Sequence, residues 1–241
     1  MVVMKAPTMK KPGKIVILGS SGHGLAVWDA CLSAGFTPIG FVDPGQSSSR
    51  VEGLPVVPTF SDINLTDLDV ALGIGHNLTR ERAAMELLEE YPEVRMPVIV
   101  HRTAWVSPSA TLEAGTVVLA QASVGPFATA GRGALLNTGS SLDHESKLDD
   151  FASLGPGSHT GGQVFIGART MVGLNAGILQ GISIGSDTGY RRAIFCPHRH
   201  PGRNRGVWCA LRPSPNPTGY RHLLIARATD TPVSRPGRGI Y

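Results

Sequence analysis

The sequence predicts a small α/β domain with a parallel sheet, an all-β solenoid after it, and an irregular C-terminal tail. Three observations lead to this prediction. Strand-like and helix-like segments alternate over residues 14–100, a six-residue repeat runs over residues 101–188, and the composition changes sharply at residue 189. With 241 residues, the chain is long enough for two such domains, each with its own core.

Composition argues against several classes of protein. Three cysteines are too few for a disulfide framework, no apolar run is long enough to cross a membrane, and the first residues lack the pattern of a secretory signal. We therefore expect a cytoplasmic protein without a membrane partner. Residues 1–13 are expected to be a disordered leader.

The α/β domain, residues 14–100, is predicted from alternating short apolar runs and helical patterns. Such alternation is typical of a parallel sheet covered by helices. The expected elements, in order, are a strand at 14–18, a helix reaching Leu32, a strand ending at Asp43, a strand at 70–75, a helix at 79–91 and a strand at 98–100.

A glycine-rich turn with the spacing Gly-x-x-Gly-x-Gly, residues 19–24, joins the first strand to the first helix. A helix that begins directly after a strand offers its N-terminus to anions, and Asp43 ends the next strand, where a ribose hydroxyl would be bound. The spacing is not that of dinucleotide-binding domains and the domain is short, so a nucleoside diphosphate is favoured over NAD. The alternative is that the glycines only form a tight turn.

The six-residue repeat predicts a triangular solenoid. From Val106 to Ile184, 12 of the 14 residues spaced six apart are Val, Leu or Ile, and no insertion breaks the phase. Glycine often follows the aliphatic residue, and a small side chain often precedes it by two positions. We expect each hexad to form one short strand and a turn occupied by glycine or a small polar residue, and three hexads to close one coil.

The tail, residues 189–241, differs from the rest of the chain. It holds ten Arg, no Lys and one acidic residue, against 12 basic and 17 acidic residues elsewhere, so the formal net charge of +4 comes from the tail. It has no helical or strand period and is expected to be disordered. Its Cys and His residues fit no usual zinc spacing, so no metal is expected. Arginine-only basicity with abundant Pro and Gly is typical of a GC-rich gene read out of frame, and we hypothesise such a frameshift.

Two motifs together resemble a known family. The first is a strand followed by Gly-Ser-Ser-Gly-His-Gly-Leu-Ala-Val and then Phe-Val-Asp; the second is Leu-Asn-Thr-Gly-Ser-Ser-Leu-Asp-His-Glu within the repeat. Over residues 14–188 the chain resembles the NeuD/PglD-type sugar acetyltransferases, which include nucleotide-sugar N-acetyltransferases and sialic acid O-acetyltransferases. The resemblance implies a Rossmann-like N-terminal domain, a left-handed parallel β-helix, a homotrimer, and acetyl-CoA bound between neighbouring subunits. It also implies transfer of an acetyl group to a nucleotide-linked 4-amino sugar.

His144 is the candidate general base. It follows the core residue Leu142 by two positions and falls on a turn, and imidazole is suited to proton transfer near neutral pH. Glu145 can orient the ring and raise its basicity. The resemblance further implies that the nucleotide sugar is bound by Ser21, Gly22, His23, Asp43, Gly75 and Asn137, and acetyl-CoA by Ser153, Gly162 and Leu174.

Other functions remain open at this stage. The same histidine base would serve O-acetylation of a sugar such as sialic acid. A non-catalytic solenoid scaffold would need no base at all. Nucleic-acid binding through the arginine-rich tail is not expected, because the tail lacks interleaved aromatic residues. A zinc-dependent carbonic anhydrase on the same prism would need three histidines that converge from neighbouring subunits, and is not expected either.

Overall fold

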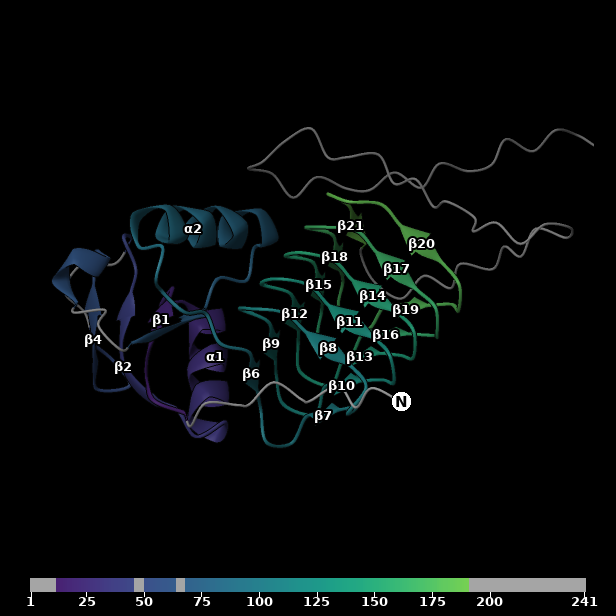
Figure 1. The fold of residues 1–241 in the computed structure, drawn as a ribbon, viewed down its shortest axis with the longest axis horizontal. Coiled ribbons are helices and arrows are strands. Elements are labelled where there is room, and N and C mark those ends of the chain that lie inside the picture. Colours follow the sequence, from purple (N-terminus) through teal and green to yellow (C-terminus); the bar gives the residue numbers. More distant parts are fainter. Residues whose placement is uncertain (1–11, 46–49, 64–67, 191–241) are drawn as a thin grey trace, which may run out of the picture.

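The computed structural model describes residues 12–45, 50–63 and 68–190. Figure 1 shows two parts side by side, an α/β part formed by the N-terminal residues and a β-helix formed by the residues after them. Residues 1–11 of the expected leader and residues 191–241 of the tail lie outside the described residues. The predictions about disorder, frameshift and zinc for these segments therefore stay predictions.

The α/β part contains one five-stranded sheet with the order β3-β4-β2-β1-β5. The pairs β1–β2, β1–β5 and β2–β4 are parallel, and β3–β4 is antiparallel. The sequence did not predict the β3–β4 hairpin, whose strands are short. The elements are β1 (Lys14–Leu18), α1 (Gly22–Ser33), β2 (Thr37–Val42), β3 (Arg50–Val51), β4 (Leu54–Val57), a 3-10 turn (Phe60–Asp62), β5 (Asp69–Leu72) and α2 (Asn77–Glu90).

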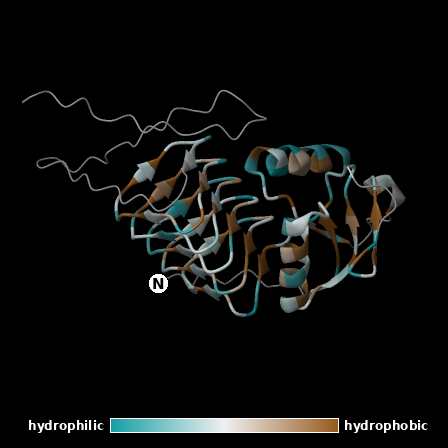
Figure 2. Cartoon of the chain, turned by 180° about the vertical axis from the view of Figure 1, so that it is seen from behind, coloured by the Kyte–Doolittle hydropathy of each residue, from teal (hydrophilic) through white to brown (hydrophobic). Residues whose placement is uncertain are grey.

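The inner strand β1 is apolar and buried from Ile15 to Leu18 because both faces of the sheet are covered. Ile15 and Ile17 pack in one cluster with α1, whereas Val16 and Leu18 pack in another with α2. Successive side chains of a strand point to opposite faces, so a strand buried on both faces reads as a continuous apolar run. In Figure 2 the strands of this sheet are accordingly brown along most of their length.

The β-helix consists of two-residue strands that stack in three parallel sheets, one for each side of a triangular prism. This arrangement agrees with the predicted left-handed β-helix, and each coil takes 18 residues, as the register of Leu136 on Val118 shows. The strands are β6 (Ile99–Val100), β7 (Trp105–Val106), β8 (Thr111–Leu112), β9 (Val117–Val118), β10 (Ser123–Val124), β11 (Thr129–Ala130), β12 (Leu135–Leu136), β13 (Ser141–Leu142), β14 (Lys147–Leu148), β15 (Ser153–Leu154), β16 (His159–Thr160), β17 (Phe165–Ile166), β18 (Met171–Val172), β19 (Gly177–Ile178), β20 (Ser183–Ile184) and β21 (Gly189–Tyr190).

Two expectations about the chain's path were wrong. The strand expected at 98–100 exists as β6, but it pairs with β9 of the β-helix and not with the sheet of the α/β part. The glycine after the aliphatic residue does not occupy the left-handed turn position, which falls two residues later, as at Gln121 (φ 59°). That glycine is needed because coils approach closely: a Cβ on Gly155 would lie 2.7 Å from the carbonyl oxygen of Val172 in the next coil.

The two parts share an apolar core and a polar junction. Val117 and Leu135 of the β-helix belong to the same buried cluster as Val27 and Ala30 of α1. The other helix, α2, lies over one corner of the prism, and the side-chain amide of Asn77 donates hydrogen bonds to two carbonyls there. The α/β part is therefore held against the β-helix by both helices.

No helix within the described ranges is long and apolar enough to span a bilayer.

Candidate functional site

The imidazole of His144 and the carboxylate of Glu145 meet on one corner of the prism. Both residues lie on the turn between β13 and β14, and Nδ1 of His144 is 3.2 Å from Oε2 of Glu145. A carboxylate only accepts hydrogen bonds, so this contact holds the proton on Nδ1 and leaves Nε2 as a proton acceptor. The side chain of His144 is 44% exposed, which leaves Nε2 within reach of a second molecule. This pair has the arrangement of a general base with an orienting carboxylate.

Gln163 completes this arrangement and was not identified from the sequence. Its Nε2 donates a 3.2 Å hydrogen bond to the same Oε2 of Glu145 that accepts from His144. The hydrogen bonds from Gln163 and from His144, in that order, lower the pKa of the Glu145 carboxyl and keep it ionised. Gln163 follows Glu145 by 18 residues, one coil, and that spacing was the signal that could have found it.

Gly162 lies directly against the imidazole ring. A Cβ on Gly162 would lie 2.8 Å from Nδ1 of His144 and closer still to Cε1 and Nε2. The glycine is thus required by the position of the ring. Within the described part of the chain, the backbone N–H of Gly162 donates to no acceptor. The corner therefore combines a proton acceptor with an unused backbone donor beside it.

Asp143 supports the turn instead of the ring. Its Oδ1 accepts a 2.7 Å hydrogen bond from the backbone N–H of His144, and its own N–H donates to Oγ1 of Thr160 at 2.9 Å. Thr160 occupies an inward-facing position that most hexads of the repeat fill with an aliphatic residue, and its hydroxyl accepts this bond. These bonds fix the backbone that carries His144.

A second group of predicted residues gathers at the carboxyl end of the α/β sheet. The backbone N–H and the hydroxyl of Ser20, just after β1, donate to Oδ2 of Asp43 at 2.9 and 2.7 Å, and the N–H of Gly45 donates to Oδ1 at 3.0 Å. Burial alone would raise the pKa of Asp43, but these hydrogen bonds outweigh it and lower the pKa. Asp43 is therefore an ionised carboxylate beside the glycine-rich turn.

Packing requires some of the glycines in the glycine-rich turn and does not require another. Gly19 has a positive φ of 104°, and a Cβ on Gly24 would collide with the carbonyl of Gly19, so both glycines are needed for packing. A Cβ on Gly22, in contrast, would meet no atom of the described residues within 4 Å. Ser21 precedes the helix but makes no side-chain capping hydrogen bond. Among the described residues, no side chain therefore caps the N-terminus of α1, as an anion site requires.

His23 follows in the same turn and packs against Gly75. The nearest ring and Cβ atoms of His23 lie 3.5 Å from the position a Cβ would take on Gly75, and its Nε2 is buried without a hydrogen-bond partner among the described residues. Burial, and then the charge of Arg80, lower the pKa of His23 to about 4. The ring is therefore neutral at neutral pH, with one buried nitrogen unused.

The remaining predicted residues lie away from the corner that carries His144. Asn137 accepts a 2.8 Å hydrogen bond from the N–H of Thr138 on its own turn, after β12. Ser153 is 4% exposed on β15, and Leu174 is 57% exposed on the turn after β18. One hexad, at most about 20 Å of chain, separates neighbouring corners. Within one chain the structure thus brings Ser21, Gly22, His23, Asp43 and Gly75 together in one group and His144, Glu145 and Gly162 in another.

The group around His144 and the group around His23 face different corners. The helix that follows Gly75, α2, contacts the corner formed by the turns of Gly133, Phe151 and Arg169. His144 is on the corner one hexad before it. A single chain therefore holds two half-sites that do not meet: the group around His144 and the group around His23. Within the described residues, no cluster of three or more His, Cys, Asp or Glu side chains could hold a metal ion.

Comparisons with known proteins agree with both halves of the fold. Residues 14–87 match the family model described as PglD N-terminal domain. The acetyltransferase domain of PglB from Neisseria gonorrhoeae, solved in complex with acetyl coenzyme A, is 28% identical with a TM-score of 0.71, over 76% of this chain and 91% of that one.

PerB from Caulobacter crescentus, solved with CoA and GDP-perosamine, is 30% identical with a TM-score of 0.67, over 74% of this chain and 86% of that one. A histidine-to-alanine mutant of the GDP-perosamine N-acetyl transferase from the same organism, also with CoA and GDP-perosamine, is 29% identical with a TM-score of 0.68 and the same coverage. These likenesses span the α/β part, the β-helix and their order along the chain. The chain belongs to the PglD/NeuD-type family of sugar acetyltransferases.

Proposed function

We propose that this protein transfers the acetyl group of acetyl-CoA to the amino group of a nucleotide-linked 4-amino sugar. The observation that carries the proposal is the His144–Glu145 pair, whose imidazole lies against Gly162, a residue whose N–H donates to no acceptor among the described residues. The similarity to proteins solved with acetyl coenzyme A and with GDP-perosamine supports the choice of donor and acceptor. Acetyl-CoA is a co-substrate in this reaction, and no metal takes part in the proposed steps.

The two parts of the chain have different functions in this reaction. Residues 14–100 bind the nucleotide sugar: the diphosphate lies at the N-terminus of α1, at Ser21 and Gly22, and Asp43 accepts a hydrogen bond from a ribose hydroxyl. His23 and Gly75 form the wall beside it. Residues 101–188 carry out acyl transfer and bind acetyl-CoA, with Gly162 at the reacting end and Leu174 further along the prism.

Proton transfer through His144 makes the acceptor amine reactive. Nε2 of His144 takes a proton from the amine as its nitrogen attacks the thioester carbonyl carbon, and the imidazolium is stabilised by Glu145. The negative charge that develops on the carbonyl oxygen is stabilised by the N–H of Gly162. When the C–S bond breaks, the CoA sulfur leaves and accepts the proton from the imidazolium. The products are the acetamido sugar and free CoA thiol.

Assembly of three chains would join the two half-sites. Because His144 and the nucleotide-sugar group face different corners of one prism, a neighbouring subunit must supply one of them. We propose a homotrimer, in the cytoplasm, in which the base of one subunit meets the sugar held by the next, with Asn137 and Ser153 near the same interface. Light scattering of the purified protein tests this, and a monomer that retains full activity would contradict it.

The reaction is tested by following thiol release. The protein is incubated with acetyl-CoA and with UDP-, GDP- or dTDP-linked 4-amino sugars, and release is expected with one of them. His144→Ala is expected to lose roughly 10²–10⁴-fold in rate, as removal of a general base does. Release only with a free sugar acid would indicate O-acetylation instead. A catalytically silent protein would favour a non-catalytic solenoid, whereas an active protein with an unaffected His144→Ala variant would show that His144 is not the base.

A further inference from the structure

Arg80 is a buried cation without an acidic partner. It is 1% exposed, and burial lowers the pKa of its guanidinium to about 10, so the group is charged at neutral pH. Among the described residues it forms no ion pair; every hydrogen-bond acceptor it uses is a neutral oxygen. A buried charge of this kind is tolerated only when its donors are satisfied, and here all three nitrogens of the guanidinium donate.

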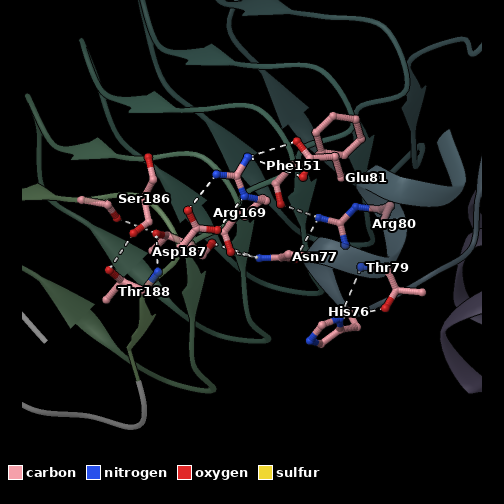
Figure 3. Close-up of polar contacts among 12 residues, drawn as sticks. His76, Asn77, Thr79, Arg80, Glu81, Phe151, Arg169, Ser186, Asp187 and Thr188 are labelled. Atoms are coloured by element: carbon pink, nitrogen blue, oxygen red, sulfur yellow. Dashed lines mark hydrogen bonds and ion pairs between the residues drawn. The ribbon is translucent and has the colours of Figure 1, made fainter. Parts of the chain in front are cut away.

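The hydrogen bonds of Arg80 join three parts of the protein. Nε donates to the carbonyl of Gly133 at 2.9 Å, and Nη2 to the carbonyl of Phe151 at 2.9 Å, in two successive coils of the β-helix. Nη1 donates to the carbonyls of Ile74 and Gly75 at 3.0 and 3.1 Å, in the loop between β5 and α2. Figure 3 shows the guanidinium between Phe151 and Asn77, and Nη2 also donates to Oδ1 of Asn77 at 2.9 Å.

The loop held by Arg80 forms one wall of the proposed nucleotide-sugar site. Gly75 packs against His23, and the Nε2 of His23 is buried with no partner among the described residues. The charge of Arg80 acts on that ring, since it contributes to the lowered pKa of His23. Arg80 therefore influences the site by geometry, through the loop, and by charge, through the histidine.

We propose that Arg80 is a positioning residue for the nucleotide sugar. By holding the carbonyls of Ile74 and Gly75 against the coils of Gly133 and Phe151, it sets the position of the substrate-binding loop relative to the β-helix that carries out acyl transfer. This inference rests on the proposed function of the glycine-rich turn as the nucleotide-sugar site. It names a role for a residue that touches no substrate and lies outside both half-sites.

Arg169 provides a matched control, because it joins the same helix to the same corner without touching the loop. Its guanidinium bridges Glu81 of α2, at 3.1 Å, and Asp187 of the β-helix, at 2.6 Å. Figure 3 shows this cluster beside that of Arg80. If Arg80 only docked α2, then losing Arg169 would affect substrate binding in the same way. If Arg80 positions the loop, the two substitutions will differ.

The test compares Arg80→Met and Arg80→Lys with Arg169→Met in the full-length protein. Binding of GDP and of UDP is measured by calorimetry, and KM is measured for the nucleotide sugar and for acetyl-CoA. We expect both Arg80 variants to weaken nucleoside-diphosphate binding and raise KM for the nucleotide sugar about tenfold or more, since small displacements in a site have large effects. The KM for acetyl-CoA should change less than threefold, and Arg169→Met should leave nucleotide binding within about twofold of wild type.

NMR supplies a second readout, which reports the charge of Arg80 at His23. In Arg80→Met the pKa of His23 should rise, because a positive charge is removed, whereas Arg80→Lys and Arg169→Met should keep it low. If Arg80→Met does not fold, Arg80→Lys decides the question by the same binding criteria. In the wild-type protein, saturating GDP or UDP should shift the Nε–H resonance of Arg80, and an unshifted resonance would contradict the proposal.

The outcomes separate this inference from the proposed function. If the wild-type protein binds neither nucleoside diphosphate, the proposed nucleotide-sugar site itself is wrong. If the wild type binds one and both Arg80 variants bind it equally well, the positioning role is wrong while the site stands. Equal weakening by Arg80→Met and Arg169→Met would likewise overturn the positioning role, because docking alone would then explain it.

Discussion

Replacing Gly162 by alanine should disable the candidate base without unfolding the protein. A Cβ at this position would lie 2.8 Å from Nδ1 of His144 and nearer to two other ring atoms, distances that real Cβ atoms do not adopt. The ring must therefore move. It can do so at little cost in stability, because the His144 side chain is 44% exposed. The backbone of Gly162 is not in the left-handed region, so alanine introduces no backbone strain there.

The size of the effect follows from the displacement. Restoring an ordinary contact requires the ring to shift by about 1 Å, and a misplacement of that size can reduce a rate by about 10²-fold. The change in unfolding free energy should stay within about 0.5 kcal/mol, as for a surface substitution. Because alanine keeps the N–H of residue 162, the loss should come from kcat and follow the base, approaching the loss in His144→Ala.

The assay measures kcat for acetyl transfer together with the thermal midpoint. Gly177→Ala is the matched control, since Gly177 lies on β19 of the same prism and a Cβ there would meet no described residue within 4 Å. We expect Gly177→Ala to behave as wild type in both measurements. If Gly162→Ala keeps its activity within threefold while it folds normally, the position of the ring over Gly162 is not the catalytic one, and the reasoning fails.

Three further predictions follow from single contacts. Gln163→Leu should lower kcat and move the acidic limb of the pH–rate profile to higher pH, because Glu145 loses a hydrogen bond that lowers its pKa. Gln121→Leu, at the equivalent left-handed turn position of another corner, should leave kcat and the pH–rate profile unchanged. Asp43 has a depressed pKa, so its hydrogen bonds stabilise the fold above its unfolded pKa of 3.8, and this contribution is lost as the pH falls through the lower folded pKa. The stability difference between wild type and Asp43→Asn, measured by denaturant unfolding, should accordingly be constant near neutral pH and shrink below pH 3.8; a difference that grows on acidification would refute it. Gly155→Ala should lower the free energy of unfolding by about 1–3 kcal/mol through a clash with the next coil. Gly185→Ala, at the same position of its hexad but with no described residue within 4 Å of its Cβ, should change it little; equal effects would show that coil spacing is not the cause.

The β-helix could be predicted almost completely from the sequence. A period of six without insertions determines which residue of each hexad points inward, because each strand has the same length and each turn the same shape. Val124, Leu142 and Leu154 are fully buried as expected, and the strands they belong to pair in register with the next coil. The role of the glycines was misjudged, since the close approach of coils is a contact between residues 17 to 19 positions apart.

The α/β part was predicted less well where its strands are short. The hairpin of β3 and β4 has strands of two and four residues, too few to show a period. The strand β6 was assigned to the wrong sheet, because an isolated apolar run does not reveal its partner. Ile99 in fact donates its N–H to the carbonyl of Thr116, at 2.9 Å, and so begins the first coil.

By itself the sequence determined the order of the two parts, the phase of the repeat, and the residues His144, Glu145 and Asp43 as candidates for chemistry, since these follow from local pattern and residue type. Only the tertiary structure decided which side chains share a site. It placed Gln163 and Gly162 against the base one coil later, buried the charge of Arg80 among carbonyls of two parts of the fold, and set the two half-sites on different corners. The physical reason is that such contacts depend on how closely the coils stack and where the helices dock. The six-residue period places Gln163 one coil after Glu145, but it does not show which side chains touch there or where α2 binds.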